Sequence, residues 1–562
     1  MKYAITILFI FVTLLQGGYS DAVWALCGMA SIVYLAFKAK YAPPIPVLLM
    51  LSSLIAVYTA AAFVNGVTYE ALSSIGRLTV ACLWLFVFFN AETDIHETLF
   101  ITGFAVALIG YLAFSGVLPW DGAVVSRRLQ SVFQYANAAA LFLGVSAFLT
   151  RHNPKRAAFA PFLETALLLT QSVGALLVYV TGWIIRLLTD KETKAAPLFC
   201  GAGVSLIAAG LTYGLVYYAP VPFLGILPPV ALFLFRRKLH RGVEALSARK
   251  WVLWAGAGCC AAGTTLLFSL RGPRPLATYL ERLIHISDGI GVILRHPLGI
   301  GPGAWPFEVL ARQSAPYAAA KIHSEVIAVG VAAGGLAVAL LLLLIAYWFK
   351  RKTWSDTSIC VVMIFLGAAM DIPFSFLSVV LAAAMLFTQT IPTPIAIKPP
   401  VRTILLIPLA LCVAIFAQSA IKNRAEETMQ PQTLENLPVR NDTEAVLSRM
   451  SMFFYTGQQD KLDDAFGSLP RPNASAYSLK AQSHMLRQEY EAAAANALLC
   501  IEASPYQEEG YTLLGQIIPY LDAASGQMYR EKAAICKAGA KSNPLYTYIL
   551  KLVGGNEHAQ TQ

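Results

Sequence analysis

Charge is scarce in this sequence, and that scarcity excludes an ordinary soluble protein. Charged residues make up 13% of the chain and hydrophobic residues 57%, whereas a soluble domain carries roughly 25% charged residues. The apolar residues fall in runs of about 15–25, near the length that crosses the hydrocarbon core of a bilayer. A soluble fold could not bury so many runs, so the sequence predicts an all-α protein with a polytopic transmembrane helical bundle.

Several motifs that would carry chemistry are missing as well. The 9 cysteines show no CxxC or zinc-ligand spacing. No Gly-Lys-Ser/Thr follows the glycines at 299–303, which excludes a P-loop. The predicted outer segments hold no DxD pair or carboxylate cluster, so no metal ion is expected. The net charge of +10 comes from Lys and Arg in short segments between apolar runs, such as 236–238 and 350–352, which indicates membrane topology and not nucleic-acid binding.

About twelve to fifteen membrane spans are predicted, because residues 157–188 and 198–235 could each be one long tilted helix or two helices. Splitting both fits the positive-inside rule best. The N-terminus is then cytoplasmic, the C-terminal domain is extracytoplasmic, and the opposite short loops carry only Arg77 and the pair Arg127–Arg128. The fifteen spans lie near residues 3–17, 22–37, 45–64, 75–90, 98–115, 135–150, 157–171, 174–188, 198–216, 221–235, 251–269, 323–347, 356–371, 373–391 and 402–420.

Residues 421–562 differ in character from the preceding 1–420, since charge rises and helical periodicity appears. Aromatic and small residues recur at the offsets of a tetratricopeptide repeat, a helix pair of 34 residues. Pro544 follows Pro505 by more than one period, which predicts a longer turn between the helices of the second copy. We interpret Cys500 and Cys536 as buried packing residues. Such repeats bind extended partners; alternatively, the domain is a packing cap for the membrane part. The repeat positions are Tyr477, Ala481, Ala493, Cys500 and Pro505, then Tyr511, Leu514, Gly515, Cys536 and Pro544, with a degenerate pair at 441–470.

Residues 270–322 form the one long outer loop of this topology, and polar residues concentrate there. The glycines at 299–303 indicate a tight turn that lets the backbone approach something closely. His323 stands where the next span begins, and the positive end of a helix disfavours a protonated imidazole. A neutral imidazole there could act as a base; alternatively, it is an interfacial histidine bonded to water. The polar residues are Arg282, His285, Asp288, Arg295, His296, His323, Ser324 and Glu325.

Four stretches carry a family resemblance. The run ERLIHISDGIGVILRHPLGIGPGAW at 281–305, followed by HSEVIAVGVAAGG at 323–335, resembles the signature loop of the O-antigen ligase and polymerase superfamily. That pattern has an Arg, then hPllGvGpG, then a histidine entering a helix with a Gly pair. RRLQSVFQYANAAA at 127–140, LLTQSVGALL at 168–177 and Asp371 are similar to other outer segments of the family. Relatives that glycosylate proteins also carry a helical repeat domain after the membrane part.

The resemblance implies a metal-independent glycosyltransferase, without a cofactor, at the outer face of the bacterial cytoplasmic membrane. It would move a glycan from undecaprenyl diphosphate to a hydroxyl of a glycan, lipid or protein acceptor, for example a surface-layer protein. Arg guanidinium groups suit the phosphate oxygens, whose charge grows as the bond breaks. Arg282 is the first candidate for this contact and Arg128 the second. Arg295 and Glu325 are equally compatible with a structural role, and His323 would take the acceptor proton or orient the acceptor.

Two positions depart from the family pattern. Val173 stands where many members have Arg, so one expected phosphate contact is missing, and Arg128 or Arg77 would have to replace it. Ser324 stands where members usually have Asn after the histidine, although Ser can still cap a helix.

Two other functions stay open from the sequence. A polymerase of lipid-linked repeat units would use the same chemistry with a glycan acceptor. A polysaccharide transporter or flippase would place ionisable residues at mid-membrane, whereas the candidate residues here cluster in an outer loop and at helix ends.

Overall fold

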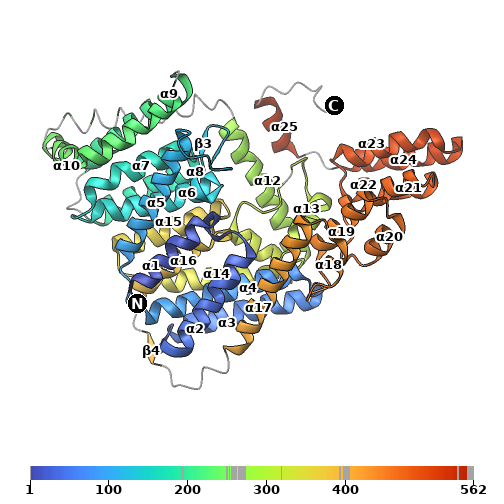
Figure 1. Cartoon of the computed structure of the whole chain (residues 1–562), viewed down its shortest axis with the longest axis horizontal. Helices are drawn as coiled ribbons and strands as arrows, with labels where there is room; N and C mark the ends of the chain where they lie inside the picture. Colours follow the sequence, from blue (N-terminus) through green and yellow to red (C-terminus); the bar gives the residue numbers. More distant parts are fainter. Residues whose placement is uncertain are drawn as a thin grey trace. The chain divides into compact units, whose positions relative to one another are not determined.

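The computed structural model of the chain is almost wholly helical (Figure 1). It describes residues 2–190, 195–219, 221–247, 251, 254, 258, 262–263, 274–317, 319–391, 394–396, 405–540 and 543–552. In this part the only strands are two antiparallel pairs of two residues each, β1 (Tyr41–Ala42) with β4 (Ile395–Ala396) and β2 (Val124–Val125) with β3 (Arg128–Leu129). The all-α class predicted from the sequence is confirmed.

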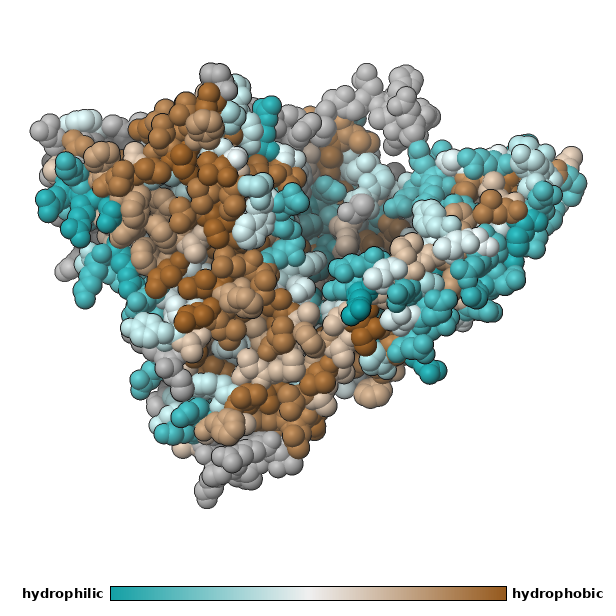
Figure 2. All heavy atoms as spheres, in the orientation of Figure 1, coloured by the Kyte–Doolittle hydropathy of each residue, from teal (hydrophilic) through white to brown (hydrophobic). Residues whose placement is uncertain are grey.

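Within the described residues, 7 helices are long and apolar enough to cross a membrane. Apolar side chains on them are exposed, for example Phe37 and Ile407 at 77% and 76%, as expected for surfaces that face lipid. Figure 2 shows brown, hydrophobic surface over much of this part and mostly teal surface over the C-terminal helices. The 7 helices are α2 (Asp21–Lys38), α3 (Ile45–Asn65), α4 (Tyr69–Asn90), α5 (Ile95–Phe114), α9 (Ala195–Tyr218), α14 (Glu325–Arg351) and α17 (Leu406–Glu427). Shorter apolar helices are α1 (Lys2–Leu14), α7 (Ala160–Leu169), α8 (Val173–Thr189), α15 (Asp356–Met370) and α16 (Leu377–Thr390).

The two long apolar segments that could have been single helices are each divided into two. Between α7 and α8, Gln171 has a φ of 51° and the Ser172 hydroxyl caps α8 by accepting from Ala175 N at 3.4 Å. Between α9 and α10 (Leu227–Ser247), Pro222 begins a short 3₁₀ helix. Both segments therefore contain two helices, as the preferred split predicts; the topology inferred from that split stays a prediction. The predicted span 251–269 and the start of 402–420 lie largely outside the described residues.

The chain divides into two compact units, and each is described by itself. Unit 1 comprises residues 1–48, 80–275 and 344–401, and unit 2 comprises residues 49–79, 276–343 and 402–562. Unit 2 therefore joins the signature loop and the C-terminal region. Helix α17 continues through residue 420, where the sequence predicts the domain boundary.

In unit 1 the core is built around α6 (Ala136–His152). Every residue of α6 from 138 to 150 is buried, and the helix packs against α5, α7, α8 and α15. Small residues allow this close packing. A Cβ on Gly103 of α5 would lie 2.6 Å from Ser146, and a Cβ on Gly367 of α15 would lie 2.6 Å from Leu141.

In unit 2 the segment predicted as a long outer loop is largely helical. It contains α12 (Arg274–Arg295) and α13 (Trp305–Arg312), and the described residues between α13 and α14 form no helix. Helix α14 is interrupted at Gly334, which has a φ of 82°. A Cβ there would overlap the carbonyl oxygen of Pro297. The Gly pair at 334–335 thus lets the residues after α12 pack against the middle of α14.

The C-terminal part of unit 2 consists of successive helix pairs. The connection between the helices of the second predicted copy spans five residues, 518–522, against three, 487–489, in the first, and α24 has 17 residues where α22 has 14. Cys500 is buried as predicted, whereas Cys536 is only half-buried, and both are free thiols. The helices are α18 (Pro431–Glu435), α19 (Thr443–Tyr455), α20 (Gln459–Gly467), α21 (Ala474–Leu486), α22 (Tyr490–Ala503), α23 (Glu508–Ile517), α24 (Ala523–Gly539) and α25 (Pro544–Leu552).

Candidate functional site

Two glycines bring α12 and α14 of unit 2 into close contact. A Cβ on Gly289 would overlap Ile327 of α14, and a Cβ on Gly330 would lie 2.5 Å from Ile293 of α12. His285 precedes Gly289 by about one helical turn, and His323 precedes Ile327 by the same number of residues. The close approach of the two helices therefore brings both histidines to the same place.

The two histidines form a cluster with Tyr317. The ring centroid of His285 lies 5.5 Å from that of His323, with nearly parallel planes, and 4.1 Å from that of Tyr317. Asp288, on the next turn of α12, accepts hydrogen bonds from the Tyr317 hydroxyl at 2.8 Å and from Ser314 N at 2.9 Å. Asp288 therefore fixes the ring that covers His285.

His285 is the most unusual member of this cluster. Its side chain is 3% exposed, and neither ring nitrogen has a hydrogen-bond partner among the described residues. The carboxylate oxygen Oε1 of Glu281 lies 4.0 Å from Nε2, beyond hydrogen-bond reach. Burial, the largest cause, and the charges of His323 and Arg282 together lower the pKa of His285 to about 4. His285 is therefore neutral at neutral pH.

The sequence-predicted arginines do not all gather at this cluster. Arg282 does, since it lies on α12 one turn before His285 and acts on its charge. Arg295 ends α12, and its Nε donates to the carbonyl of Gly291 at 2.9 Å. Ten residues of helix separate it from His285, about 15 Å along the axis. Arg77, which the topology places in a short outer loop, instead lies within α4, two turns after its start.

The glycines of the signature loop meet protein backbone. Gly299, Gly301 and Gly303 have φ values of 72°, 100° and 72°, a region that favours glycine. A Cβ on Gly299 would lie 2.6 Å from the backbone of α14, and one on Gly303 would lie 2.6 Å from the backbone of Glu70 at the start of α4. The expected close approach is present, and it is an approach to α14 and α4.

Arg471, from the C-terminal helices, holds this glycine segment. Its guanidinium donates to the carbonyl of Ile300 at 2.9 Å, to the carbonyl of Asn65 at 2.6 Å and to the carboxylate of Glu308. Glu308 also accepts from Arg312 Nε at 2.7 Å. One side chain thus ties the C-terminal helices to the signature loop and to the end of α3.

Further contacts join the C-terminal helices to the same part of unit 2. Glu70 accepts from Thr443 N at 2.8 Å, at the N-terminus of α19 where a carboxylate is favourable. Asn543 donates to the Ser314 hydroxyl at 2.9 Å. Ile549 of α25 belongs to the apolar cluster that contains Ile284 of α12.

The remaining family-like segments converge in unit 1. Arg128 donates to the Thr170 carbonyl at 3.0 Å and to the Asn137 side-chain oxygen at 3.1 Å, which also accepts from the Ser172 hydroxyl at 2.8 Å. Asn137 donates in turn to Asp371 at 2.6 Å. Residues from 127–140, 168–177 and 371, far apart in the sequence, therefore form one hydrogen-bond network.

Backbone strain accompanies this network. Non-glycine residues with positive φ include Ser126, Arg127, Ser131, Gln134 and Gln171. Such conformations persist where the surroundings over-determine them, and they concentrate at functional sites. Arg128 lies inside this strained stretch, with residues of positive φ before it and after it in the sequence, and these fix the position of its backbone.

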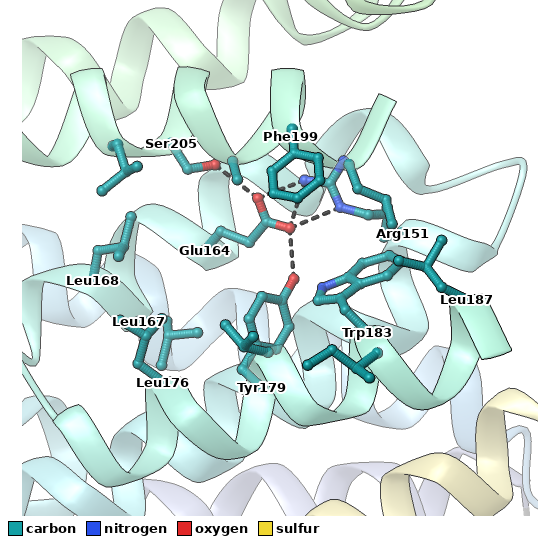
Figure 3. A pocket seen from close by; sticks show the side chains of 15 residues that line it. Arg151, Glu164, Leu167, Leu168, Leu176, Tyr179, Trp183, Leu187, Phe199 and Ser205 are labelled. Atoms are coloured by element: carbon teal, nitrogen blue, oxygen red, sulfur yellow. Dashed lines mark hydrogen bonds and ion pairs between the residues drawn. The ribbon is translucent and has the colours of Figure 1, made fainter. Parts of the chain in front are cut away.

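Unit 1 also holds a buried carboxylate at an apolar cavity of about 200 Å³ (Figure 3). Glu164 is 4% exposed and accepts from Arg151 Nε at 2.7 Å, from the Tyr179 hydroxyl at 2.6 Å and from the Ser205 hydroxyl at 2.7 Å. An acidic residue within the apolar run 157–171 is the sequence signal for such a site, and we did not predict it.

Sequence reasoning named His285 without a role and missed Asn137 and Arg471 as site residues. Asn137 lies within the family-like segment 127–140, and its place in that segment is the sequence signal that could have marked it as a site residue. Arg471 lies in a short connection between α20 and α21, with nothing in its neighbourhood that indicates a contact with residue 300.

No protein-family model, curated protein or solved structure matches the chain. The family resemblance therefore continues to rest on the quoted segments.

Proposed function

We propose that the chain is a glycosyltransferase of the O-antigen-ligase type, which transfers a glycan from undecaprenyl diphosphate to an acceptor hydroxyl at the outer face of the cytoplasmic membrane. The observation that carries the proposal is the network of unit 1 described above. Three segments chosen only for their similarity to the family meet at Arg128, Asn137 and Asp371.

The arrangement of His323 and Arg282 in unit 2 supports the proposed transfer reaction. In the proposed reaction the acceptor oxygen bonds to the anomeric carbon, the bond from that carbon to the diphosphate oxygen breaks, and the acceptor proton passes to His323. Arg282 carries a fixed positive charge beside the two histidines, where it can meet the charge that grows on the diphosphate. General base catalysis of this kind contributes about 10²–10⁴ in rate.

The C-terminal helices support a tetratricopeptide-like domain. Helices α21 and α23 begin at residues 474 and 508, one repeat period of 34 residues apart. We propose that this domain presents a protein acceptor to the signature loop. Its contacts through Arg471 and Glu70 also agree with the packing-cap alternative, and both roles are compatible.

The orientation is part of the proposal. The charge distribution favours a cytoplasmic N-terminus and an extracytoplasmic C-terminal domain. A reporter fused after residue 420 should be active outside the cytoplasm. Activity of that reporter in the cytosol would contradict the whole scheme.

The direct test is transfer by purified protein. Undecaprenyl diphosphate carrying a labelled oligosaccharide is supplied with candidate protein, lipid and glycan acceptors, and the labelled product is identified. A longer lipid-linked glycan would identify a polymerase. Movement of label across a vesicle membrane without transfer would identify a flippase.

Variants of single residues test the proposed roles of His323 and Arg282. His323→Ala should abolish transfer while the protein still inserts in the membrane, and His484→Ala is the matched control. Arg282→Ala should raise KM for the lipid-linked donor, with Arg487→Ala as its control. Normal transfer by the His323 variant would remove the proposed base, and an unaltered KM would assign Arg282 to structure.

A further inference from the structure

A second histidine of the proposed site has no role in the chemistry described above. His285 is almost completely buried on α12, and both of its ring nitrogens lack a hydrogen-bond partner among the described residues. Buried polar groups in native proteins are nearly always hydrogen-bonded, and the exceptions require an explanation. Leaving such a group unpaired costs about 1–3 kcal/mol. A phenylalanine ring, which has no polar nitrogen, would not carry that cost.

We propose that His285 is a second substrate-binding residue, whose ring N–H donates a hydrogen bond to a phosphate oxygen of the lipid diphosphate beside His323. This inference rests on the proposed function and extends it, because it assigns the unpaired imidazole to the diphosphate group of the donor.

The charges around His285 favour an anionic ligand. Arg282 and His323 both lie near enough to disfavour a second positive charge on His285. The nearby carboxylates are Glu281, 4.0 Å away, and Asp288, which is already bonded to the Tyr317 hydroxyl and Ser314 N. A phosphate would bring an acceptor for the unpaired ring N–H and a negative charge beside the guanidinium of Arg282. A neutral imidazole is also the form that donates one hydrogen bond without adding charge.

The cover over His285 can open without unfolding a helix. Tyr317 and His323, whose rings contact His285, both come from the stretch between α13 and α14, in which the described residues form no helix. Rotation of the Tyr317 ring, with loss of its hydrogen bond to Asp288, would expose the imidazole. The inference therefore requires only a side-chain movement of the kind common on ligand binding.

His285→Phe is the variant that separates a binding role from a packing role. Phenylalanine keeps a buried ring against Tyr317 and His323 and removes both nitrogens. We expect the full-length variant to unfold at a higher temperature than the wild type, because an unpaired buried polar group is removed. His285→Gln keeps an N–H donor and should retain part of the binding. If His285→Phe does not fold, His285→Leu, which also lacks a side-chain N–H donor, is compared with His285→Gln.

The probe is undecaprenyl diphosphate without a glycan, titrated into purified full-length protein in bicelles. We expect Kd for this lipid to rise at least about tenfold in His285→Phe, the usual effect of losing a hydrogen bond to a charged group, and to rise less in His285→Gln. His484→Phe is the control, since His484 Nδ1 contacts Glu489 and Arg487 far along the C-terminal helices; its Kd should not change.

The outcomes distinguish the two proposals. Unchanged Kd in His285→Phe, or a lower unfolding temperature with unchanged Kd, would overturn the inference whether or not the wild type transfers glycan. Histidine-dependent binding of the diphosphate by a wild type that transfers no glycan would support the inference and contradict the proposed transferase function. An altered KM for the acceptor with unchanged Kd for the diphosphate would also overturn the inference, because it would assign His285 to the acceptor.

Discussion

Replacing Arg471 by leucine should release the signature loop from the C-terminal helices. The guanidinium makes three hydrogen bonds, to the carbonyls of Ile300 and Asn65 and to Glu308. Its side chain is 22% exposed, so water partly replaces these bonds when they are lost. Hydrogen bonds to charged groups contribute about 1.5–3 kcal/mol each when well buried, and with partial exposure we expect a total loss of about 2–3 kcal/mol.

Hydrogen exchange measures this loss locally. Amides of residues 299–312 exchange when the loop opens, and an opening free energy lower by about 2–3 kcal/mol speeds their exchange about 30- to 150-fold. The assay is hydrogen–deuterium exchange with mass spectrometry on the purified protein in bicelles, with peptides covering 299–312 compared between wild type and variant. Peptides of α6 in unit 1 should show no change.

Arg487→Leu is the matched control, since Arg487 has the same side-chain exposure, 23%, and donates to Asp463 at 2.8 Å within the C-terminal helices. It should leave exchange of 299–312 unchanged. Unaltered exchange of this segment in Arg471→Leu, or an equal increase in both variants, would refute the conclusion that Arg471 specifically holds the loop.

Three further predictions concern stability. Glu164→Gln should lower the stability of unit 1 by about 3–5 kcal/mol, because it leaves the charge of Arg151 buried without its partner; a thermal unfolding temperature equal to that of the wild type would contradict this. Gly334→Ala should destabilise the protein strongly, since φ at Gly334 is positive and a backbone carbonyl occupies the position of the new Cβ. Gly335→Ala is the control and should be tolerated, because its Cβ would meet open space. Equal unfolding temperatures of the two variants would count against the interrupted helix. The pKa of His285 is about 4 in the folded protein, against 6.5 ordinarily. Because the unfolded chain therefore binds the proton at a higher pH than the folded chain, stability should fall as the pH drops from about 6.5 to about 4, by about 1.4 kcal/mol per pKa unit. Denaturant titrations at several pH values should show a smaller fall in His285→Phe than in the wild type.

The helices were predictable because their signal is local. An apolar run of sufficient length forms a helix in a bilayer whatever its neighbours do. Fourteen of the fifteen predicted spans overlap described helices, and 7 of these helices are long and apolar enough to cross a membrane. The break between α7 and α8 was predicted from charge placement alone. Its physical cause, the strained Gln171 with the Ser172 cap, has no comparable signal in the sequence.

The site was only partly predictable. The structure places His323 and Arg282 beside His285 and places Arg128 in the network of unit 1, whereas Arg295 and Arg77 lie apart from both. Arg295 bonds to its own helix, and Arg77 lies inside α4. Whether a side chain points to a cluster or away from it depends on helix rotation and register, which packing partners decide.

Composition and motifs by themselves determined that this chain is helical and apolar enough for a membrane. Those properties follow from runs of neighbouring residues, since length, hydropathy and period are set within a segment. Only the tertiary structure decided that His285 would be buried without a partner, that Arg128, Asn137 and Asp371 would share one network, and that Arg471 would hold Ile300. Each of these depends on contacts between residues far apart in the chain, and such contacts form only when whole helices pack.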